Sequence, residues 1–280
     1  MGYGTKLWGT GIPEEPLAFG GQFGFSQQRQ GMEAGRPYTR LLRRLDSVVR
    51  LSESDRLGIT KLPMTVKNFA NGQDLIREGD ISTQCILVLD GYLFRHKLAN
   101  GSQRQIMSFH VPGDVPDLQT LHLPKLDHTV TALGAAVVAF IPHAAFKELL
   151  QASPSLTHVF WRESLVDAAI FREWVITLGQ RDAIGRVAHL ICELVMRLQA
   201  VGLAKDMAFT IPWTQSDVAD ASGISTVHAN RVIQELRRLE LLEWDSRLIQ
   251  IRNWDGLASL GDFSVDYLHF RKDEPASIAS

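Results

Sequence analysis

Two short helical patterns of apolar residues lie on either side of a turn of small residues in the last third of the chain. In the first pattern Val218 and Ala219 are the inward positions, and Thr214 precedes them as a candidate N-cap. Ser225 is the candidate N-cap of the second helix, whose apolar stripe is Ala229, Val232, Ile233, Leu236 and Leu239. Gly223 stands between the two, and glycine accepts the left-handed backbone that ends many helices. The pattern predicts a helix-turn-helix.

The segment that follows, EWDSRLIQI from Glu243 to Ile251, has two short alternating runs that predict a β-hairpin. A hairpin directly after the second helix is typical of a winged-helix domain. The exposed face of that helix carries mostly hydrogen-bonding and cationic residues: Thr226, Val227, His228, Asn230, Arg231, Gln234 and Arg238. Such groups contact phosphates and base edges in the DNA major groove. A helical hairpin that is merely buried in a core is the alternative interpretation.

From Met64 to Ile141 the pattern changes to short alternating runs punctuated by Gly, Asp, Asn and Pro, which predicts an all-β domain. The expected strands are 85–89 and 92–98 on either side of Asp90-Gly91, 104–110 after Asn100-Gly101, then 129–133 and 137–141. Closing or sandwiching such a sheet protects its strand edges and leaves an interior that can hold a ligand. A small barrel or jelly roll is therefore predicted.

Amphipathic helices flank the β domain. The apolar spacing predicts helices at 38–51, 53–61, 143–150, 154–178 and 181–198. The helix over 154–178 has two apolar stripes, which consist of Val159, Val166 and Ile170 and of Phe160, Phe171, Trp174 and Leu178. One stripe is expected to cover the β domain and the other to pair with the same helix of a second chain. This predicts a homodimer, with a helix buried in one domain as the alternative.

The chain has 280 residues, of which 45% are hydrophobic and 21% charged, so it is long enough for two ordinary globular domains. No apolar run approaches the length of a transmembrane helix, and the N-terminus lacks the order of a signal peptide. We therefore expect a cytoplasmic protein that does not contact a membrane. Residues 1–37 are glycine-rich without an apolar period, which predicts a mobile extension. A start of translation at Met32 is a hypothesis that the intact mass of the native protein would test.

The formal net charge of −2 argues against indiscriminate nucleic-acid binding. DNA binding then depends on the local placement of Arg231, Arg237, Arg238 and Arg247. Cys85 and Cys192 are the only cysteines, too few for a disulfide framework, a zinc site or a four-thiolate cluster. Histidines in and beside the β domain lack the His-x-His spacing of a metal-binding jelly roll, and neither a nucleophile elbow nor a phosphate loop occurs. We expect no cofactor and no enzyme activity.

Two Gly-Asp pairs, Gly79-Asp80 and Gly113-Asp114, and the run TQSDVADASGISTVHANRVIQELRR fit one known architecture. In these residues, and in the order of its elements, the stretch from Tyr38 to Phe263 resembles the Crp/Fnr family of bacterial transcription regulators. The resemblance implies an α+β fold with a jelly-roll-like β roll, a long dimerisation helix and a C-terminal winged helix-turn-helix. The implied parts are an extension at 1–37, a cyclic-nucleotide-binding-like sensor domain at 38–152, the dimerisation helix at 153–180, the DNA-binding domain at 181–263 and a tail at 264–280.

The resemblance also implies roles for residues of the helix-turn-helix. It places Thr226, Val227 and Arg231 at base-reading positions, and Thr214, Ser225 and His228 at phosphate-facing positions. Gln215 and Asn230 complete the predicted DNA-binding set. The family often has an acidic residue where this chain has Val227, so we expect a different base preference at that position. Valine offers apolar contact with a thymine methyl group instead.

The nucleotide-binding members of the family hold a cyclic phosphate with an Arg-Ser or Arg-Thr pair, and this chain departs from that pattern. No arginine occurs between Arg104 and Arg162, and His128-Thr129 stands in place of the pair, with Asp117 near the family's glutamate. Asp117, His128 and Thr129 are the candidate effector residues. Burial of a phosphate beside acids without a guanidinium is costly, so we do not expect cyclic AMP as the effector. The iron-sulfur centre of the oxygen-sensing branch is excluded because only two cysteines are present.

Taken together, the sequence predicts a homodimeric, sequence-specific DNA-binding transcription regulator. Its predicted partners are a palindromic double-stranded operator, a second copy of the chain and, as a candidate, RNA polymerase. The alternative is a β-roll (cupin-like) enzyme or ligand carrier whose C-terminal helices mediate protein contacts.

Overall fold

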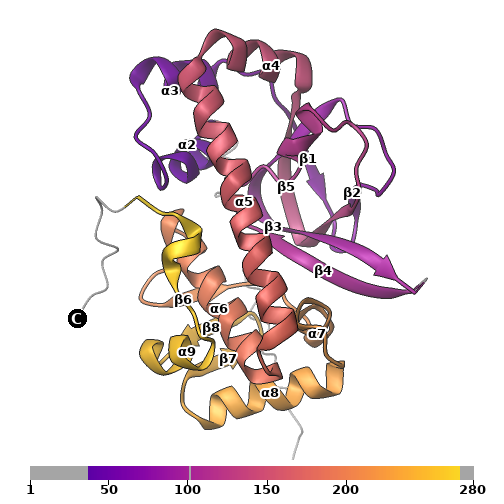
Figure 1. Cartoon of the computed structure of the whole chain (residues 1–280), viewed down its shortest axis with the longest axis vertical. Helices are drawn as coiled ribbons and strands as arrows, with labels where there is room; N and C mark the ends of the chain where they lie inside the picture. Colours follow the sequence, from indigo (N-terminus) through magenta and orange to yellow (C-terminus); the bar gives the residue numbers. More distant parts are fainter. Residues whose placement is uncertain (1–36, 101, 272–280) are drawn as a thin grey trace, which may run out of the picture. The chain divides into compact units, whose positions relative to one another are not determined.

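The structure of the chain is a computed structural model that describes residues 37–100 and 102–271 (Figure 1). The predicted extension at 1–37 lies outside the described residues except for Pro37, which precedes the first described helix. None of the described helices is long and apolar enough to cross a membrane. The predicted α+β fold is confirmed: a β roll, a long helix and a C-terminal helix-turn-helix follow one another along the chain.

The β roll is a sheet of five antiparallel strands. Their bounds are β1 Thr65–Phe69, β2 Asp74–Ile76, β3 Gln84–Ala99, β4 Gln103–His110 and β5 Thr129–Pro142. The strand order is β1-β5-β3-β4, with β2 also paired to β5. Side chains of β3 and β5, with Leu126 from the loop before β5, form an apolar core of Ile86, Val88, Leu93, Leu126, Val130, Ala132, Ala136 and Val138.

Two predicted interruptions of the strands are wrong. Instead of ending at Asp90-Gly91, β3 continues through it, and β5 likewise spans the expected gap at residues 134–136. The pairing of β3 with β5 shifts register between Val88, Asp90 and Tyr92, and Gly91 and Gly134 both have positive φ. These glycines therefore form irregularities within long strands, where an extra residue bends and twists the sheet without ending it.

Short helices cover one end of the β roll. They are α2 Tyr38–Asp46, α3 Glu53–Thr60, α4 His143–Ala152 and the 3-10 helix η1 Leu118–Leu121. The predicted first helix ends five residues early, at Asp46, although Val48 and Leu51 are still buried. Leu41, Leu45, Phe146 and Phe160 belong to the core that joins these helices to β3 and β5.

The long helix α5, Pro154–Gln180, begins with Ser153 as N-cap and Pro154 in its first turn, which suits proline because that position needs no backbone donor. Both predicted apolar stripes are packed within the chain, and Phe160 and Trp174 are only 3% and 7% exposed. The expectation that one of these two stripes pairs with a second chain is therefore wrong, because both are covered within the chain. The exposed apolar residues of α5 form another face: Trp161, Leu165, Val175 and Ile176.

The C-terminal part begins with α6, Ala183–Ala200, which is buried along most of its length. The elements that follow are β6 Ala208–Thr210, α7 Gln215–Ser222, α8 Thr226–Arg238, β7 Leu242–Asp245, β8 Leu248–Ile251, α9 Trp254–Leu260 and η2 Val265–Leu268. The strands β7 and β8 form the predicted hairpin, to which β6 adds a third strand. The expected tail at 264–280 includes η2, where Tyr267 stacks on His189 of α6.

Candidate nucleic-acid interface and internal cavity

The helix-turn-helix has the caps that its sequence predicts. Thr214 Oγ1 accepts a hydrogen bond from Asp217 N at 3.1 Å, and Thr214 N donates to Asp217 Oδ2 at 2.9 Å, which is a capping box. Gly223 ends α7 with φ 63° in the left-handed region, and Ser225 Oγ accepts from His228 N at 3.2 Å to start α8. These contacts determine where α7 ends and α8 begins, and so set the direction of α8.

One face of α8 is buried and the other is exposed. Ala229, Val232, Ile233 and Leu236 pack inward, as the apolar stripe predicts. Leu239, the last member of that predicted stripe, is 42% exposed because α8 ends one residue before it.

Most of the predicted DNA-binding residues are exposed. They are Thr214 and Gln215 at the start of α7, and Ser225, Thr226, Val227, His228 and Arg231 in or beside the first turns of α8. Asn230 is half-buried. Arg238 is held by Glu235 at 2.6 Å on the same helix, whereas no ion pair occupies Arg231 among the described residues. Arg231 is therefore available to a phosphate or a base edge, and the exposed Arg237 and Arg247 likewise have no ion pair among the described residues.

The sequence did not reveal a contact between the β roll and the helix-turn-helix. Arg104 on β4 donates from Nη2 to Asp217 Oδ1 at 2.8 Å and from Nε to Asp220 Oδ2 at 2.7 Å. Gln105 Nε2 donates to the backbone carbonyl of Asp220 at 2.7 Å. These residues are more than a hundred positions apart, and no local pattern relates them. Asp217 thus has two roles, because it caps α7 and also binds the β roll.

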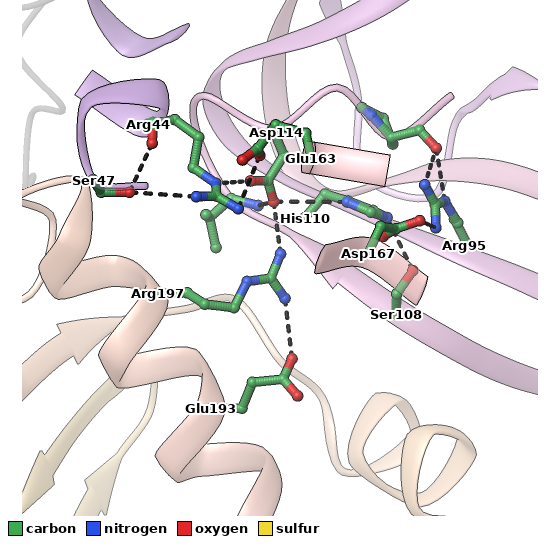
Figure 2. A network of polar contacts seen from close by, with 12 residues as sticks. Arg44, Ser47, Arg95, Ser108, His110, Asp114, Glu163, Asp167, Glu193 and Arg197 are labelled. Carbon is green, nitrogen blue, oxygen red and sulfur yellow. Dashed lines mark hydrogen bonds and ion pairs between the residues drawn. The ribbon is translucent and has the colours of Figure 1, made fainter. Parts of the chain in front are cut away.

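A cavity of about 260 Å³ lies among α2, the β roll, α5 and α6. Its charged side chains form the buried network in Figure 2. Asp114 binds Arg197 at 2.7 Å and Arg44 at 3.3 Å, and Arg44 also binds Glu163 at 3.0 Å. Burial alone would raise the pKa of Asp114, but the guanidinium groups of Arg197 and Arg44, with His110 also nearby, hold it well below its usual range. The network joins α2 and α5 to α6, which begins the C-terminal part.

A second ion pair closes another side of the cavity. Arg95 on β3 donates to Asp167 Oδ2 on α5 at 2.8 Å and to the carbonyl oxygen of Pro116 at 2.7 Å. His110, fully buried nearby, binds Ser108 through Nε2 at 2.9 Å. Burial, with the positive charge of Arg95, lowers the pKa of His110 to about 4, so the imidazole is neutral at neutral pH.

Of the three candidate effector residues, His128 alone lines the cavity. Asp117 is fully buried under β3, where Oδ1 accepts from Ile86 N at 2.7 Å. Burial raises the pKa of Asp117 to about 7. Thr129 Oγ1 accepts from Glu78 N at 3.1 Å, away from the cavity lining. The sequence did not predict a role toward an effector for the charged cavity residues Arg44 of α2, Arg95 of β3, Glu163 and Asp167 of α5, and Arg197 of α6. No spacing in the sequence links the three helices to the β roll.

The described residues contain no group of three or more His, Cys, Asp or Glu side chains arranged to hold a metal ion. Both cysteines are free and buried, and burial raises their thiol pKa values above the usual range. Thiolate chemistry is therefore disfavoured at Cys85 and Cys192.

Comparisons with known proteins agree with this architecture. Residues 66–153 match the cyclic nucleotide-binding domain, and residues 185–260 match the Crp-like helix-turn-helix domain. The chain is 24% identical over 195 residues to the transcriptional activator protein FnrA of Stutzerimonas stutzeri, covering 70% of this chain and 80% of that protein. It is 28% identical over 171 residues to the nitrogen fixation regulation protein FixK of Bradyrhizobium diazoefficiens, covering 61% of this chain and 71% of that protein.

Solved structures share the fold. FixK2 from Bradyrhizobium japonicum superposes with a TM-score of 0.66 at 22% identity, covering 72% of this chain and 100% of that one. A CooA mutant from Carboxydothermus hydrogenoformans gives a TM-score of 0.58 at 14% identity, covering 79% and 95%. The β roll matches the cyclic nucleotide-binding domain, and the C-terminal part matches the Crp-like helix-turn-helix domain. The similarity to FnrA extends over 80% of the length of that relative. The protein therefore belongs to the Crp/Fnr family of transcription regulators.

Proposed function

We propose that the protein regulates transcription by sequence-specific binding of double-stranded DNA, and that it is not an enzyme. The observation that carries this proposal is α8, which presents Arg231, Thr226 and Val227 on an exposed surface after a tightly capped turn. A helix of this kind fits the major groove, where an arginine binds guanine in a bidentate manner and a valine contacts a thymine methyl group. The relatives FnrA and FixK are named as an activator and a regulation protein, which supports the same role.

The active form is a homodimer in this proposal. The exposed apolar face of α5 supports it, because Trp161, Leu165 and Val175 are 61%, 55% and 70% exposed. This face follows steps of four and three residues, the spacing at which two helices pack along a seam. Its positions are 161, 165, 168, 172, 175 and 179. Two-fold symmetry then requires a palindromic operator with half-sites about one helical turn apart.

The β roll is the sensor in this proposal, and its internal cavity is the effector site. Arg197 of α6 lines the cavity together with His128 of the β roll, so a bound molecule contacts both parts of the chain. Cyclic AMP is not the expected effector, because the arginines that line the cavity are already paired with acids of the chain. The proposed location is the cytoplasm, and RNA polymerase is the candidate protein partner.

The decisive experiment compares Arg231→Ala with the unaltered protein on an operator selected from random DNA. We expect the variant to lose about 1 to 3 kcal/mol of binding free energy on the operator and to relax base choice at one position per half-site. Binding to random DNA should change little. Gel shifts at near-physiological salt, with random DNA as competitor, measure both quantities.

Arg77→Ala is the charge-matched control, because Arg77 is an exposed arginine of the β roll, outside the helix-turn-helix. It should leave operator binding unchanged. Equal losses for Arg231→Ala on operator and random DNA would reduce Arg231 to a phosphate contact. Absence of any preferred DNA for the unaltered protein would contradict the proposed function itself.

A further inference from the structure

Two buried acceptor atoms of cavity-lining residues have no hydrogen-bond partner among the described residues. They are Nε2 of His128, whose side chain is 7% exposed, and Oε1 of Glu163, whose side chain is 15% exposed. Both residues line the cavity, His128 from the β roll and Glu163 from α5. Buried polar atoms are nearly always hydrogen-bonded, because an unpaired one keeps the full cost of its desolvation. A ligand that reaches both atoms would remove that cost.

The hydrogen-bonding role of His128 follows from its neighbour. Its Nδ1 lies 2.7 Å from Asp127 Oδ1, and a carboxylate only accepts hydrogen bonds, so Nδ1 carries the proton. Burial, together with the charge of Arg95, lowers the pKa of His128, which keeps the imidazole neutral. Nε2 is then the unprotonated nitrogen and accepts a hydrogen bond from whatever occupies the cavity.

Glu163 also offers an acceptor. Its Oε2 is bound to Arg44 at 3.0 Å, an ion pair visible in Figure 2, and Oε1 has no such partner. Burial raises the pKa of Glu163, and the charge of Arg44 partly offsets that rise. A donor that approaches Oε1 further favours the ionised carboxylate, because a hydrogen bond to the charged form stabilises that form.

The cations in the cavity wall are all engaged. Arg44 binds Asp114 and Glu163, Arg95 binds Asp167 and the Pro116 carbonyl, and Arg197 binds Asp114 and Glu193. The lining also holds four acids, which are Asp114, Asp127, Glu163 and Asp167, against these three arginines. An anionic group would therefore enter without a free counter-charge, at the large cost of a buried unpaired charge.

The rest of the wall is apolar and includes Leu41, Leu45, Phe160, Ile170 and Phe171. We propose that the cavity binds an uncharged or cationic small molecule with an apolar body and at least two N–H or O–H donors, one for His128 Nε2 and one for Glu163 Oε1. This inference rests on the proposed sensor role of the β roll and names the ligand class that the sensor accepts.

Three compounds with the same ring test the ligand class on the purified full-length protein. Benzamidine is a cationic donor, benzamide is neutral with donors, and benzoate is an anion without donors. Isothermal titration and saturation-transfer NMR at millimolar concentration should show binding of benzamidine and benzamide. Benzoate should not bind. Equal or tighter binding of benzoate, or binding of none of the three, overturns the proposal.

Two variants locate the binding. Glu163→Gln should weaken benzamidine binding about tenfold, which corresponds to the loss of one hydrogen bond to a charged group. Ser164→Ala is the matched control on the same wall, because its hydroxyl donates to the Phe160 carbonyl within α5 and no role toward the ligand is assigned to it. An unchanged affinity in Glu163→Gln contradicts the proposed site. If that variant does not fold, His128→Phe, which removes the other acceptor, decides in the same way.

Operator binding with and without benzamidine separates the two proposals. A compound that binds the cavity and changes operator affinity supports both the ligand class and the sensor role. A compound that binds in the cavity without any effect on DNA supports the ligand class and contradicts the sensor role. If the protein prefers no DNA, the proposed function is wrong, and the titrations with the three compounds still decide the ligand class on their own.

Discussion

Asp117 is a fully buried carboxylate in the β roll that receives one backbone hydrogen bond, from Ile86 N to Oδ1. Its Oδ2 is buried without a partner among the described residues. Burial raises its pKa to about 7 in the folded protein, compared with an ordinary value of 3.8. Between these two values the folded state holds a proton that the unfolded state has lost. The free energy of unfolding therefore falls as pH rises through this range.

Asp117→Asn should remove this pH dependence. In the unaltered protein the fall in the free energy of unfolding is complete above pH 7. It amounts to about 4 kcal/mol, at 1.36 kcal/mol per pKa unit. We expect the free energy of unfolding of the asparagine variant, relative to that of the unaltered protein, to rise by on the order of 3 kcal/mol from about pH 4 to pH 8. Urea denaturation of both proteins across this range measures the difference.

His110 makes the comparison of two proteins necessary. Its folded pKa of about 4 lies below the ordinary 6.5, so its contribution to stability rises with pH between these values, opposite to that of Asp117. Because His110 is present in both proteins, the difference between them isolates Asp117. A stability difference that does not change with pH would show that Asp117 is ionised in the folded state throughout.

Residue roles were predictable from the sequence where the contacts are local. The caps at Thr214 and Ser225 and the left-handed Gly223 involve partners within a few residues. The Arg104 contacts with Asp217 and Asp220 were not predictable, because the strand and the helix meet only in the folded chain. The same holds for Arg197, which appears from sequence to be an ordinary charged position of a helix but is buried against Asp114.

At the scale of elements, the continuity of β3 depends on Gly91. This residue has φ 74°, and a Cβ atom there would lie 2.3 Å from the backbone oxygen of Ala135 on β5. Gly72 has the same φ of 74°, but a Cβ atom at Gly72 would meet no atom within 4 Å. The two glycines therefore separate the conformational cost of alanine from the steric cost.

Gly72→Ala should destabilise the protein by about 1 kcal/mol, the cost of a left-handed backbone for alanine. Gly91→Ala adds a collision with the neighbouring strand and should cost about 3 kcal/mol or more. Thermal or urea unfolding of the two variants measures this pair of values. Equal losses would mean that β5 moves away from β3 without cost, contrary to the close pairing of the two strands.

The same pair of strands shows why element boundaries were only partly predictable. Asp90-Gly91 has the composition of a hairpin turn, and the sequence pattern alone favours one. In the fold, β5 pairs with β3 on both sides of this dipeptide, at Val88 and at Tyr92. The partner strand determines whether an Asp-Gly dipeptide ends a strand or bends it. That partner, β5, lies more than forty residues further along the chain.

At the scale of the whole molecule, Leu165 on α5 and Leu57 on α3 are matched exposed leucines, 55% and 56% exposed in one chain. The proposed dimer seam buries Leu165, whereas Leu57 lies outside it. Leu165→Glu introduces two charges into the seam of a symmetric dimer, one from each copy. We expect its dimer dissociation constant to rise at least tenfold, about 1.4 kcal/mol or more, and operator affinity to fall with it.

Sedimentation equilibrium measures the dissociation constants, and Leu57→Glu should leave them unchanged. If both variants stay dimeric with equal constants, the exposed face of α5 is not the seam. If the unaltered protein is a monomer at micromolar concentration, the homodimer proposal itself is wrong.

The sequence by itself determined the order of the parts, the helix-turn-helix with its caps, and the surface of α8 that carries Arg231, because these follow from local spacing and backbone preference. Tertiary structure decided which apolar face of α5 is buried. Helical spacing shows that several faces are apolar, but the packing of Phe160 and Trp174 against neighbouring elements leaves Trp161, Leu165, Val175 and Ile176 exposed. It also decided the cavity, whose paired arginines and unpaired acceptors come from segments that only folding brings together.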